Sequence, residues 1–245
     1  MLKLNAIASV AISNAQTSER TNQDAILPIK KVENGYLFAV ADGVGGYKGG
    51  EIASHIAISQ LEKVTYSEQI FNVFNASLAL IKDLPDEMRK ASTTLTYGFL
   101  TPTGLHIGHI GDCRLYVKEG NKLRQKTKDH TSHQKLLDEG IYTKKELKEL
   151  SGKNIITTAI SNQVEMKYDE IFIPLQELRD ENNEVTLYIM SDGAHHFWEH
   201  RPRFSDNTMK SVVKFAAALQ KRIEKAPTDD YSLIAVQFKI EELAI

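Results

Sequence analysis

Four aspartates stand at turn positions beside apolar segments, where their carboxylates could gather into one site. Asp42 and Asp192 each follow an apolar run of strand length and precede a glycine. Asp112 lies in what we interpret as a hairpin turn, and Asp229 precedes the last apolar run. Several carboxylates can share a site only when some are protonated or a cation neutralises them. The set therefore predicts a site for a divalent cation, and its all-oxygen character favours Mg²⁺ or Mn²⁺ over Zn²⁺.

Each of these residues has a structural explanation when it is taken alone, since Asp-Gly is a common turn dipeptide. The histidines at 106, 109, 195 and 196 lack a third clustered ligand, and we interpret them as strand or surface residues. Cys113 is interpreted as a small buried residue. The glycines after Asp42 do not form a phosphate-binding loop, because no Gly-Lys-Ser/Thr sequence follows them.

Apolar spacing predicts the elements that position these aspartates. Continuous apolar runs indicate strands at residues 1–12, 35–41, 95–100, 105–110, 113–117, 185–190 and 233–238. Apolar residues at helical spacing indicate amphipathic helices at residues 51–64, 70–81 and 209–223. We interpret residues 95–117 as adjacent hairpins. This grouping favours an α+β fold, with mostly antiparallel sheets and helices packed outside them, over a doubly wound parallel sheet.

Length and composition narrow the class of protein. The 245 residues contain no long Pro-, Gly- or Ser-rich linker, so we expect one domain over residues 1–245, with a polar excursion near residues 129–153. The net charge of −2 argues against a nucleic acid partner. No apolar run is long enough to span a bilayer, and a single cysteine fits a reducing compartment. We therefore expect a cytoplasmic protein without a membrane partner.

Further motifs surround the aspartates in a fixed order. They are Arg20–Asp24, Val40–Gly46 with Gly50–Ser54, Ser92–Thr94, Ile110–Leu115, the polar segments Asp129–Thr131, Glu139–Gly140 and Asn154–Thr157, then Ser191–Gly193 and Asp229–Ser232. In residue types and order this set resembles the metal-dependent protein phosphatases of type 2C, also called PPM phosphatases, in their bacterial form. The resemblance implies a four-layer α/β/β/α sandwich of two sheets packed face to face, with residues 129–153 as a flap subdomain.

The resemblance also implies how metal ions would be bound. Asp42 would bridge two ions, and the carbonyl oxygen of Gly43 would ligate one of them. Asp192 and Asp229 would hold the second ion, and Asp112 with Asp192 would hold a third, weaker one. The ions would be Mn²⁺ or Mg²⁺, and they would activate a water molecule for attack on phosphorus without a covalent phosphoenzyme.

Two residues of the first motif would serve the reaction itself. By resemblance, Arg20 would bind the substrate phosphate, and Asp24 would act through water on the metal. Arg20 lies four residues before Asp24, whereas most family members have a spacing of five. A solvated loop arginine is therefore the alternative interpretation of Arg20.

Three other positions depart from the family pattern. Val44 stands where many eukaryotic members carry a histidine proposed as general acid, and Cys113 replaces a serine. Asp230 stands where asparagine is common, so it either adds charge near the second metal or faces solvent. We predict Asp229 as the ligand, because it precedes Ser232 by three residues, as the metal aspartate does in the family.

The function implied by the resemblance is that of a signalling protein serine/threonine phosphatase, which hydrolyses phosphoserine and phosphothreonine. Its partners would be phosphorylated proteins and a cognate serine/threonine kinase system, and we expect a monomer. Residues 129–153 would border the substrate and set specificity. Two rival hypotheses are a catalytically silent phosphatase-like module that binds or regulates a partner, and a phosphatase of small phosphoesters.

Overall fold

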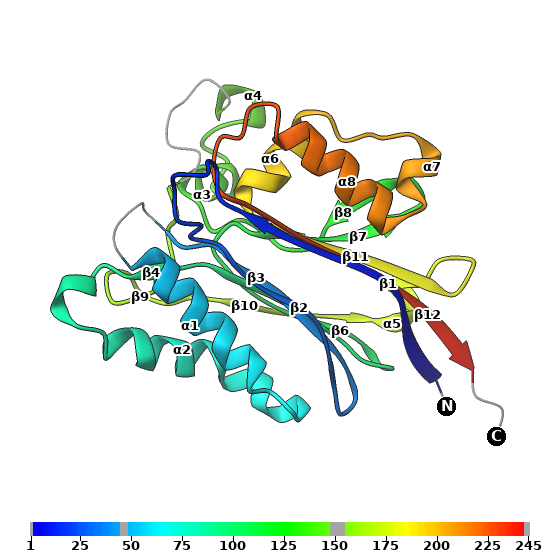
Figure 1. The fold of residues 1–245 in the computed structure, drawn as a ribbon, viewed down its shortest axis with the longest axis horizontal. Coiled ribbons are helices and arrows are strands. Elements are labelled where there is room, and N and C mark those ends of the chain that lie inside the picture. The colour runs from blue at the N-terminus through cyan, green and yellow to red at the C-terminus, as the bar shows by residue number, and fades with distance from the viewer. Residues whose placement is uncertain (1, 45–48, 148–154, 243–245) are drawn as a thin grey trace.

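Two antiparallel sheets face each other in the computed structural model, which describes residues 2–44, 49–147 and 155–242 (Figure 1). The first, called the β11 sheet, has the order β1 (Leu2–Asn14), β12 (Tyr231–Glu242), β11 (Glu184–Met190), β7 (Arg114–Glu119), β8 (Lys122–Gln125). The second, called the β3 sheet, has the order β10 (Asp169–Pro174), β6 (Gly104–Ile110), β5 (Leu95–Leu100), β3 (Gly35–Ala41), β2 (Ala25–Val32).

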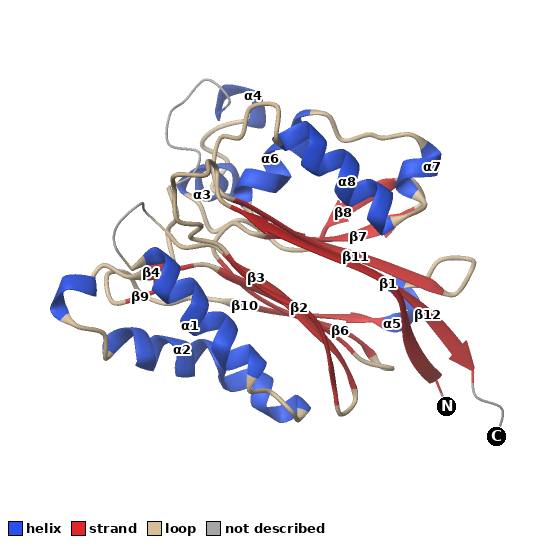
Figure 2. Cartoon of the chain, viewed as in Figure 1, coloured by secondary structure: helices blue, strands red, loops and turns tan. Residues whose placement is uncertain are grey.

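Helices cover the outer face of each sheet (Figure 2). The β3 sheet is covered by α1 (Gly50–Glu62) and α2 (Val73–Lys82), and the β11 sheet by α6 (Asp192–His200), α7 (Asp206–Met209) and α8 (Val212–Ile223). The predicted α+β class and four-layer sandwich are therefore confirmed. The remaining short elements are η1 (Ser67–Asn72), η2 (Asp86–Met88), α3 (Ser132–Asp138), α4 (Lys144–Leu147), α5 (Leu175–Leu178) and the strand pair β4 (Ser92–Thr93) and β9 (Ile160–Ser161).

Burial on both faces explains why the central strands are apolar throughout. In β11, Val185, Leu187 and Ile189 pack between the two sheets, whereas Tyr188 and Met190 pack under the helices of the β11 sheet. The side chains of β3 alternate in the same way between the inter-sheet core and the core under α1 and α2. A strand between two apolar layers loses the apolar-polar alternation of a solvent-facing strand. The last residues of β3 and β11, Ala41 and Met190, are accordingly buried.

One interpretation of the fold is wrong, and several elements were not predicted. Residues 95–110 do form a hairpin, β5 with β6, but β7 belongs to the other sheet, so Asp112 lies in a crossing between sheets and not in a hairpin turn. Gly111 turns the chain there with φ of 102°, a left-handed conformation that favours glycine. The helix α6, which begins at Asp192, and the strands β2, β8 and β10 were not expected from the apolar pattern.

Several expectations lie outside these observations. Residues 148–153 of the predicted flap and Gly45–Gly46 of the second motif fall outside the described residues. A single domain over residues 1–245 stays a prediction. No helix among the described residues combines the length and apolar character needed to cross a membrane.

Candidate active site

A cavity of about 250 Å³ opens at one end of the sandwich, just beyond the ends of β3 and β11 and the start of β12. It brings together the four predicted metal aspartates, the predicted carbonyl ligand and the predicted phosphate-binding arginine. The lining residues are Arg20, Gln23, Asp42, Gly43, Val44, Asp112, Ile156, Asp192, Asp229 and Asp230. Segments about 200 residues apart in sequence thus line one cavity, which we call the acidic pocket.

Asp42 is fixed through its backbone at the end of β3. Its amide donates to the Thr94 hydroxyl at 3.0 Å, and its carbonyl oxygen accepts from the Thr94 amide at 2.8 Å and the Thr93 hydroxyl at 2.9 Å. The next residue, Gly43, has no room for a side chain, because a Cβ there would lie 2.5 Å from the carbonyl carbon of Gly50. The backbone is therefore held on all sides while the Asp42 carboxylate faces the acidic pocket.

Asp192 begins α6 immediately after β11. A carboxylate in the first turn of a helix is favoured by the exposed backbone N–H groups there. A Cβ on the next residue, Gly193, would collide with the carbonyl oxygen of Asp230. The start of α6 therefore approaches the start of β12 more closely than a side chain would permit, and this contact brings Asp192 and Asp229 to one wall of the pocket.

Three side chains hold the crossing at Asp112. His195 donates from Nε2 to the Asp112 carbonyl oxygen at 3.1 Å, and the Thr96 hydroxyl donates to the Cys113 carbonyl oxygen at 3.1 Å. Thr94 Oγ1 contacts Cys113 Sγ at 3.3 Å. Cys113 is fully buried, as predicted, but the interpretation of His195 as a strand or surface residue is wrong, because it lies on α6 and is buried. His195 is a positioning residue, and no sequence signal marked it.

Asp24 lies behind the acidic pocket and is 3 % exposed. Its Oδ2 accepts from the Ser191 hydroxyl at 2.8 Å, and Ser191 Oγ in turn accepts from the Ser232 amide at 2.8 Å. Asp24 Oδ1 is buried and has no hydrogen-bond partner among the described residues. A buried, unpaired carboxylate oxygen is costly, so this atom is suited to a water molecule or another group that enters the site.

Asp229 and Asp230 differ sharply in their surroundings. Asp230 is 4 % exposed, and its two carboxylate oxygens accept from the backbone amides of Gln16 and Gln23, each at 2.8 Å. Asp229 is exposed, and its Oδ1 accepts from the Asp230 amide at 2.9 Å. The interpretation in which Asp230 faces solvent is therefore wrong, since Asp230 is buried and both of its oxygens hold the loop of residues 16–23. The alternative, that Asp230 adds charge near the second metal, stays a prediction, because Asp230 is one of the residues that line the acidic pocket. The engagement of both Asp230 oxygens supports the preference for Asp229 as a ligand.

The Asp230→Asn variant tests this division. Asparagine offers one acceptor oxygen, so one of the two backbone amides loses its charge-assisted bond, and we expect a loss of about 1–2 kcal/mol of folding stability. Denaturant unfolding measures this loss, and titration calorimetry with Mn²⁺ measures metal affinity. We expect Asp230→Asn to keep Mn²⁺ binding and Asp229→Asn to weaken it at least tenfold. If Asp230→Asn weakened Mn²⁺ binding and Asp229→Asn did not, Asp230 would be the metal ligand and Asp229 would not.

Arg20 reaches the rim of the acidic pocket despite its short spacing from Asp24. Its side chain is exposed, and its Nη1 donates to Gln16 Oε1. The Gln16 amide is held by Asp230, so a buried carboxylate positions the loop residue that orients the arginine. Arg20 is therefore exposed to solvent and is held beside the site by a hydrogen bond to Gln16.

The flap residues that the structure describes are tied to the site by an ion pair. Arg114 donates to Asp129 through Nε at 2.8 Å and Nη2 at 2.6 Å. Buried His109 donates from Nε2 to the Lys128 carbonyl oxygen at 2.9 Å, so the chain enters this segment along a fixed path. Ile156, beyond the segment, lines the acidic pocket.

Burial and mutual repulsion raise the pKa values of the pocket carboxyl groups. Burial first, and then the charge of Asp192, raise the pKa of Asp112 from 3.8 to about 8. Burial, with a further contribution from the charge of Asp192, raises the pKa of Asp24 to about 7, although the nearby hydroxyl groups of Ser232 and Ser191 oppose this. Burial and the charge of Asp229 raise the pKa of Asp192 to about 6, and burial and the charge of Asp24 raise that of Asp42 well above 3.8. The pocket therefore requires protons or a cation as counter-charge.

The donor set fits hard divalent cations. The lining provides carboxylate oxygens and a backbone carbonyl, which are the ligands that Mg²⁺ and Mn²⁺ prefer. As the side chains stand, no group of three or more His, Cys, Asp or Glu residues in the described part of the chain has the geometry to hold an ion. Repulsion between uncompensated carboxylates favours such a spread arrangement.

Comparison with known proteins decides the family. The family model described as Protein phosphatase 2C matches residues 13–227. The chain belongs to the protein phosphatase 2C family. The predicted enzyme class, a phosphoprotein phosphatase, is confirmed with it, and the match includes every predicted site residue except Asp229.

Bacterial members of the protein phosphatase 2C family are similar to this chain in sequence and in fold. The serine/threonine phosphatase stp of Listeria welshimeri is 26% identical over 217 residues, which cover 83% of this chain and 81% of the relative. The serine/threonine protein phosphatase PstP of Mycobacterium tuberculosis is 31% identical over 135 residues, which cover 51% of this chain and 26% of that protein.

Solved structures of bacterial phosphatases share the fold. A bacterial serine phosphatase superposes with a TM-score of 0.77 at 20% identity, covering 98% of this chain and 100% of the other. The catalytic domain of PstP, in a structure described as a complex with two manganese ions, gives a TM-score of 0.70 at 23% identity, with 98% and 100% of the chains covered.

Proposed function

We propose that this chain hydrolyses phosphoserine and phosphothreonine on proteins, using water activated at a centre of two Mn²⁺ or Mg²⁺ ions. The observation that carries the proposal is the acidic pocket, in which the four predicted metal aspartates and Asp230 line one cavity together with Arg20. Asp42 and the carbonyl oxygen of Gly43 would hold the first ion, and Asp42, Asp192 and Asp229 the second. Asp112 with Asp192 would hold a third, weaker ion.

The bound ions would supply an activated water molecule and would neutralise the charge of the phosphoryl group. The side chains of the protein bind and orient the phosphate and the water molecule. Arg20, oriented by Gln16, binds the phosphate oxygens at the rim by charge-assisted hydrogen bonds. Asp24 presents its unpaired Oδ1 to a water molecule behind the pocket and can hold that water's proton. Val44 offers no acid to the leaving alkoxide, so water bound at the site or another group would protonate it.

The family and its bacterial relatives support the choice of substrate. Relatives named serine/threonine phosphatases act on phosphorylated proteins, and we extend this to the present chain. A cognate serine/threonine kinase, a cytoplasmic location and a monomeric state complete the proposal. A catalytically silent module is the less favoured alternative, because such a module has no need to retain four carboxylates and an oriented arginine around one pocket.

Phosphate release from a phosphothreonine peptide tests the function. With Mn²⁺ present we expect turnover, and removal of the metal with EDTA should stop it. The Asp42→Ala variant should lose at least about 10³-fold in kcat, because the proposed bridging ligand is gone. Turnover of p-nitrophenyl phosphate on the same enzyme distinguishes a protein phosphatase from a phosphatase of small phosphoesters.

Three outcomes would contradict the proposal. Full activity of Asp42→Ala would remove the metal assignment. Efficient turnover of the small phosphoester with none of the peptide would reassign the substrate class. Absence of turnover with any substrate, for a folded protein that binds Mn²⁺, would favour the silent module.

A further inference from the structure

A second cavity, of about 600 Å³, lies between α6 and α8, and its lining includes four Lys and Arg side chains and two histidines. Its lining residues are His196, Phe197, His200, Arg201, Ala218, Lys221, Arg222, Lys225 and Ala226. The proposed reaction does not use any of them. We call this cavity the basic groove.

The cations of the basic groove lack carboxylate partners. Among the described residues, none of the groove's Lys, Arg or His side chains makes an ion pair, although nine ion pairs occur elsewhere. Arg222 is held structurally, because its guanidinium donates to the carbonyl oxygens of Phe197 and Arg201 and lies 4.1 Å from the ring centre of Phe204. The side chains of Arg201, Lys221 and Lys225 are exposed.

The nearby carboxylates are engaged elsewhere. Glu199 accepts from the Tyr116 hydroxyl at 3.0 Å, and Glu224 accepts from Gln220 at 2.8 Å. Burial and the charge of Arg201 lower the pKa of Arg222, so the cations of the groove repel one another. Neither carboxylate forms an ion pair with a cation of the groove, and the four Lys and Arg side chains outnumber these two carboxylates, so the groove keeps an excess of positive charge.

The basic groove adjoins the acidic pocket along two short paths. His196 is four residues from Asp192 on the same helix, a rise of about 6 Å. Ala226 is three residues from Asp229, which at full extension spans about 11 Å. Gln16, which contacts Arg20, also donates to the carbonyl oxygen of Pro227 next to Ala226. A substrate chain leaving the acidic pocket can thus reach the groove within a few residues.

We propose that the basic groove binds acidic or phosphorylated side chains of the protein substrate, three to five residues from the residue that is dephosphorylated. This inference rests on the proposed function and specifies its substrate class. Aspartate, glutamate and phosphoserine share the anionic chemistry that lysine and arginine recognise. An exposed cationic surface gains affinity mainly through such charge complementarity, and the gain decreases as salt screens it.

The test compares phosphothreonine peptides that carry two glutamates three to five residues away, on either side, with peptides that carry alanines there. For the wild-type protein at low salt we expect about tenfold higher kcat/KM on the better acidic peptide. The Lys221→Ala/Lys225→Ala variant should lose about fivefold on that peptide and nothing on the alanine peptide or on p-nitrophenyl phosphate.

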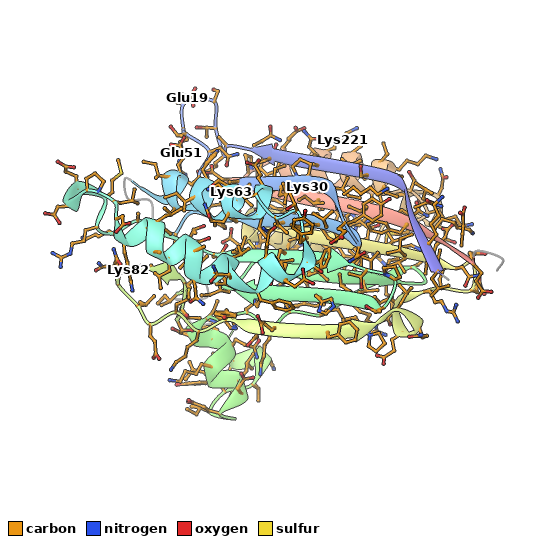
Figure 3. All side chains as sticks on the ribbon, turned by 90° about the horizontal axis from the view of Figure 1, so that it is seen from below. Glu19, Lys30, Glu51, Lys63, Lys82 and Lys221 are labelled. Carbon is orange, nitrogen blue, oxygen red and sulfur yellow. The ribbon has the colours of Figure 1, made fainter. Side chains whose placement is uncertain are left out.

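A matched control is available in the other helical layer. Lys82 lies in the last turn of α2 and Lys63 caps the C-terminus of α1, much as Lys221 and Lys225 lie at the C-terminus of α8. In Figure 3, viewed from the side of α1 and α2, Lys63 and Lys82 lie on the near helices and Lys221 lies beyond the strands. The Lys63→Ala/Lys82→Ala variant changes the net charge equally and should leave the acidic preference intact.

Binding of the acidic peptides in EDTA, measured by fluorescence anisotropy, separates this inference from the proposed function. Weaker binding by the Lys221→Ala/Lys225→Ala variant, without turnover of any peptide by the wild type, would support the groove and overturn the reaction. Turnover without acidic preference, or equal losses in the control variant, would overturn the groove. If the Lys221→Ala/Lys225→Ala variant lost binding to phosphatidylserine vesicles but behaved like the wild type with every peptide, the groove would be assigned to a membrane surface. That result would also overturn the proposal that the groove binds the substrate.

Discussion

The Asp192→Asn variant is expected to lose phosphatase activity by about 10³-fold and to raise the melting temperature of the metal-free protein at pH 8 by about 5 °C. The two effects have one cause, the carboxylate at the start of α6. In the proposed site its charge helps to hold a cation, but without the cation this partly buried carboxylate stands among other carboxylates. Asparagine keeps the shape of the side chain and removes the repulsion.

The pH dependence of this stabilisation has a definite sign. The pKa of Asp192 is raised from 3.8 to about 6, so its favourable contribution to folding is complete below pH 3.8 and is lost as pH rises through 6. At pH 8 the wild-type protein carries the full penalty, and at pH 4 it carries little. The stabilisation by Asp192→Asn should therefore appear at pH 8 and nearly vanish at pH 4.

Thermal unfolding in EDTA at both pH values measures this difference, and added Mn²⁺ provides the second readout. Mn²⁺ should raise the melting temperature of the wild-type protein and raise that of Asp192→Asn much less, because a ligand that binds only the folded state stabilises it. Asp83→Asn, at an exposed site after α2, is a suitable control. A lower melting temperature for Asp192→Asn at both pH values would show that the carboxylate stabilises the apo fold.

The Gly193→Ala variant should lose both stability and activity. On helix propensity alone alanine would stabilise α6 by about 1 kcal/mol. A Cβ at this position, however, would collide with the carbonyl oxygen of Asp230, which is backbone and cannot rotate away. We expect a net loss of about 2–3 kcal/mol and a loss of Mn²⁺ affinity, because relief of the collision displaces Asp229 and Asp230 together.

Chemical denaturation and Mn²⁺ calorimetry of the variant measure these losses. Gly120→Ala is the control, since a Cβ there has no neighbour within 4 Å, although its φ of 59° costs alanine about 1 kcal/mol. If Gly193→Ala were as stable as the wild type, the close approach of α6 and β12 would not be required.

The sequence predicted most of what depends on local pattern. The apolar runs placed β3, β5 and β11 to within one residue, because a strand buried on both faces cannot tolerate polar side chains. Turn chemistry identified Asp42 and Asp192 as neighbours of strand ends. The four layers came from the resemblance to a family and not from periodicity.

The errors share a physical origin in tertiary contacts. A Gly-Asp turn between two strands has the same local signature whether the strands pair with each other or belong to different sheets, so the crossing at Asp112 was interpreted as a hairpin turn. The helix α6 was not predicted, because polar residues make up much of its sequence and leave few apolar residues at helical spacing. Asp230 binds the backbone amides of Gln16 and Gln23, and His195 binds the backbone carbonyl oxygen of Asp112. Every residue type has these backbone groups, so the sequence does not indicate which ones will be bound.

The central position of β12 has a consequence for synthesis on the ribosome. This strand pairs with β1 on one side and β11 on the other, and Asp230, just before it, binds the amides of Gln16 and Gln23. The β11 sheet and the loop that carries Arg20 therefore cannot assemble until residues 230–242 have emerged. Such pairings over more than 200 residues make folding slow. A nascent chain therefore cannot complete its acidic pocket until these last residues have emerged, so a partly synthesised chain lacks the complete site.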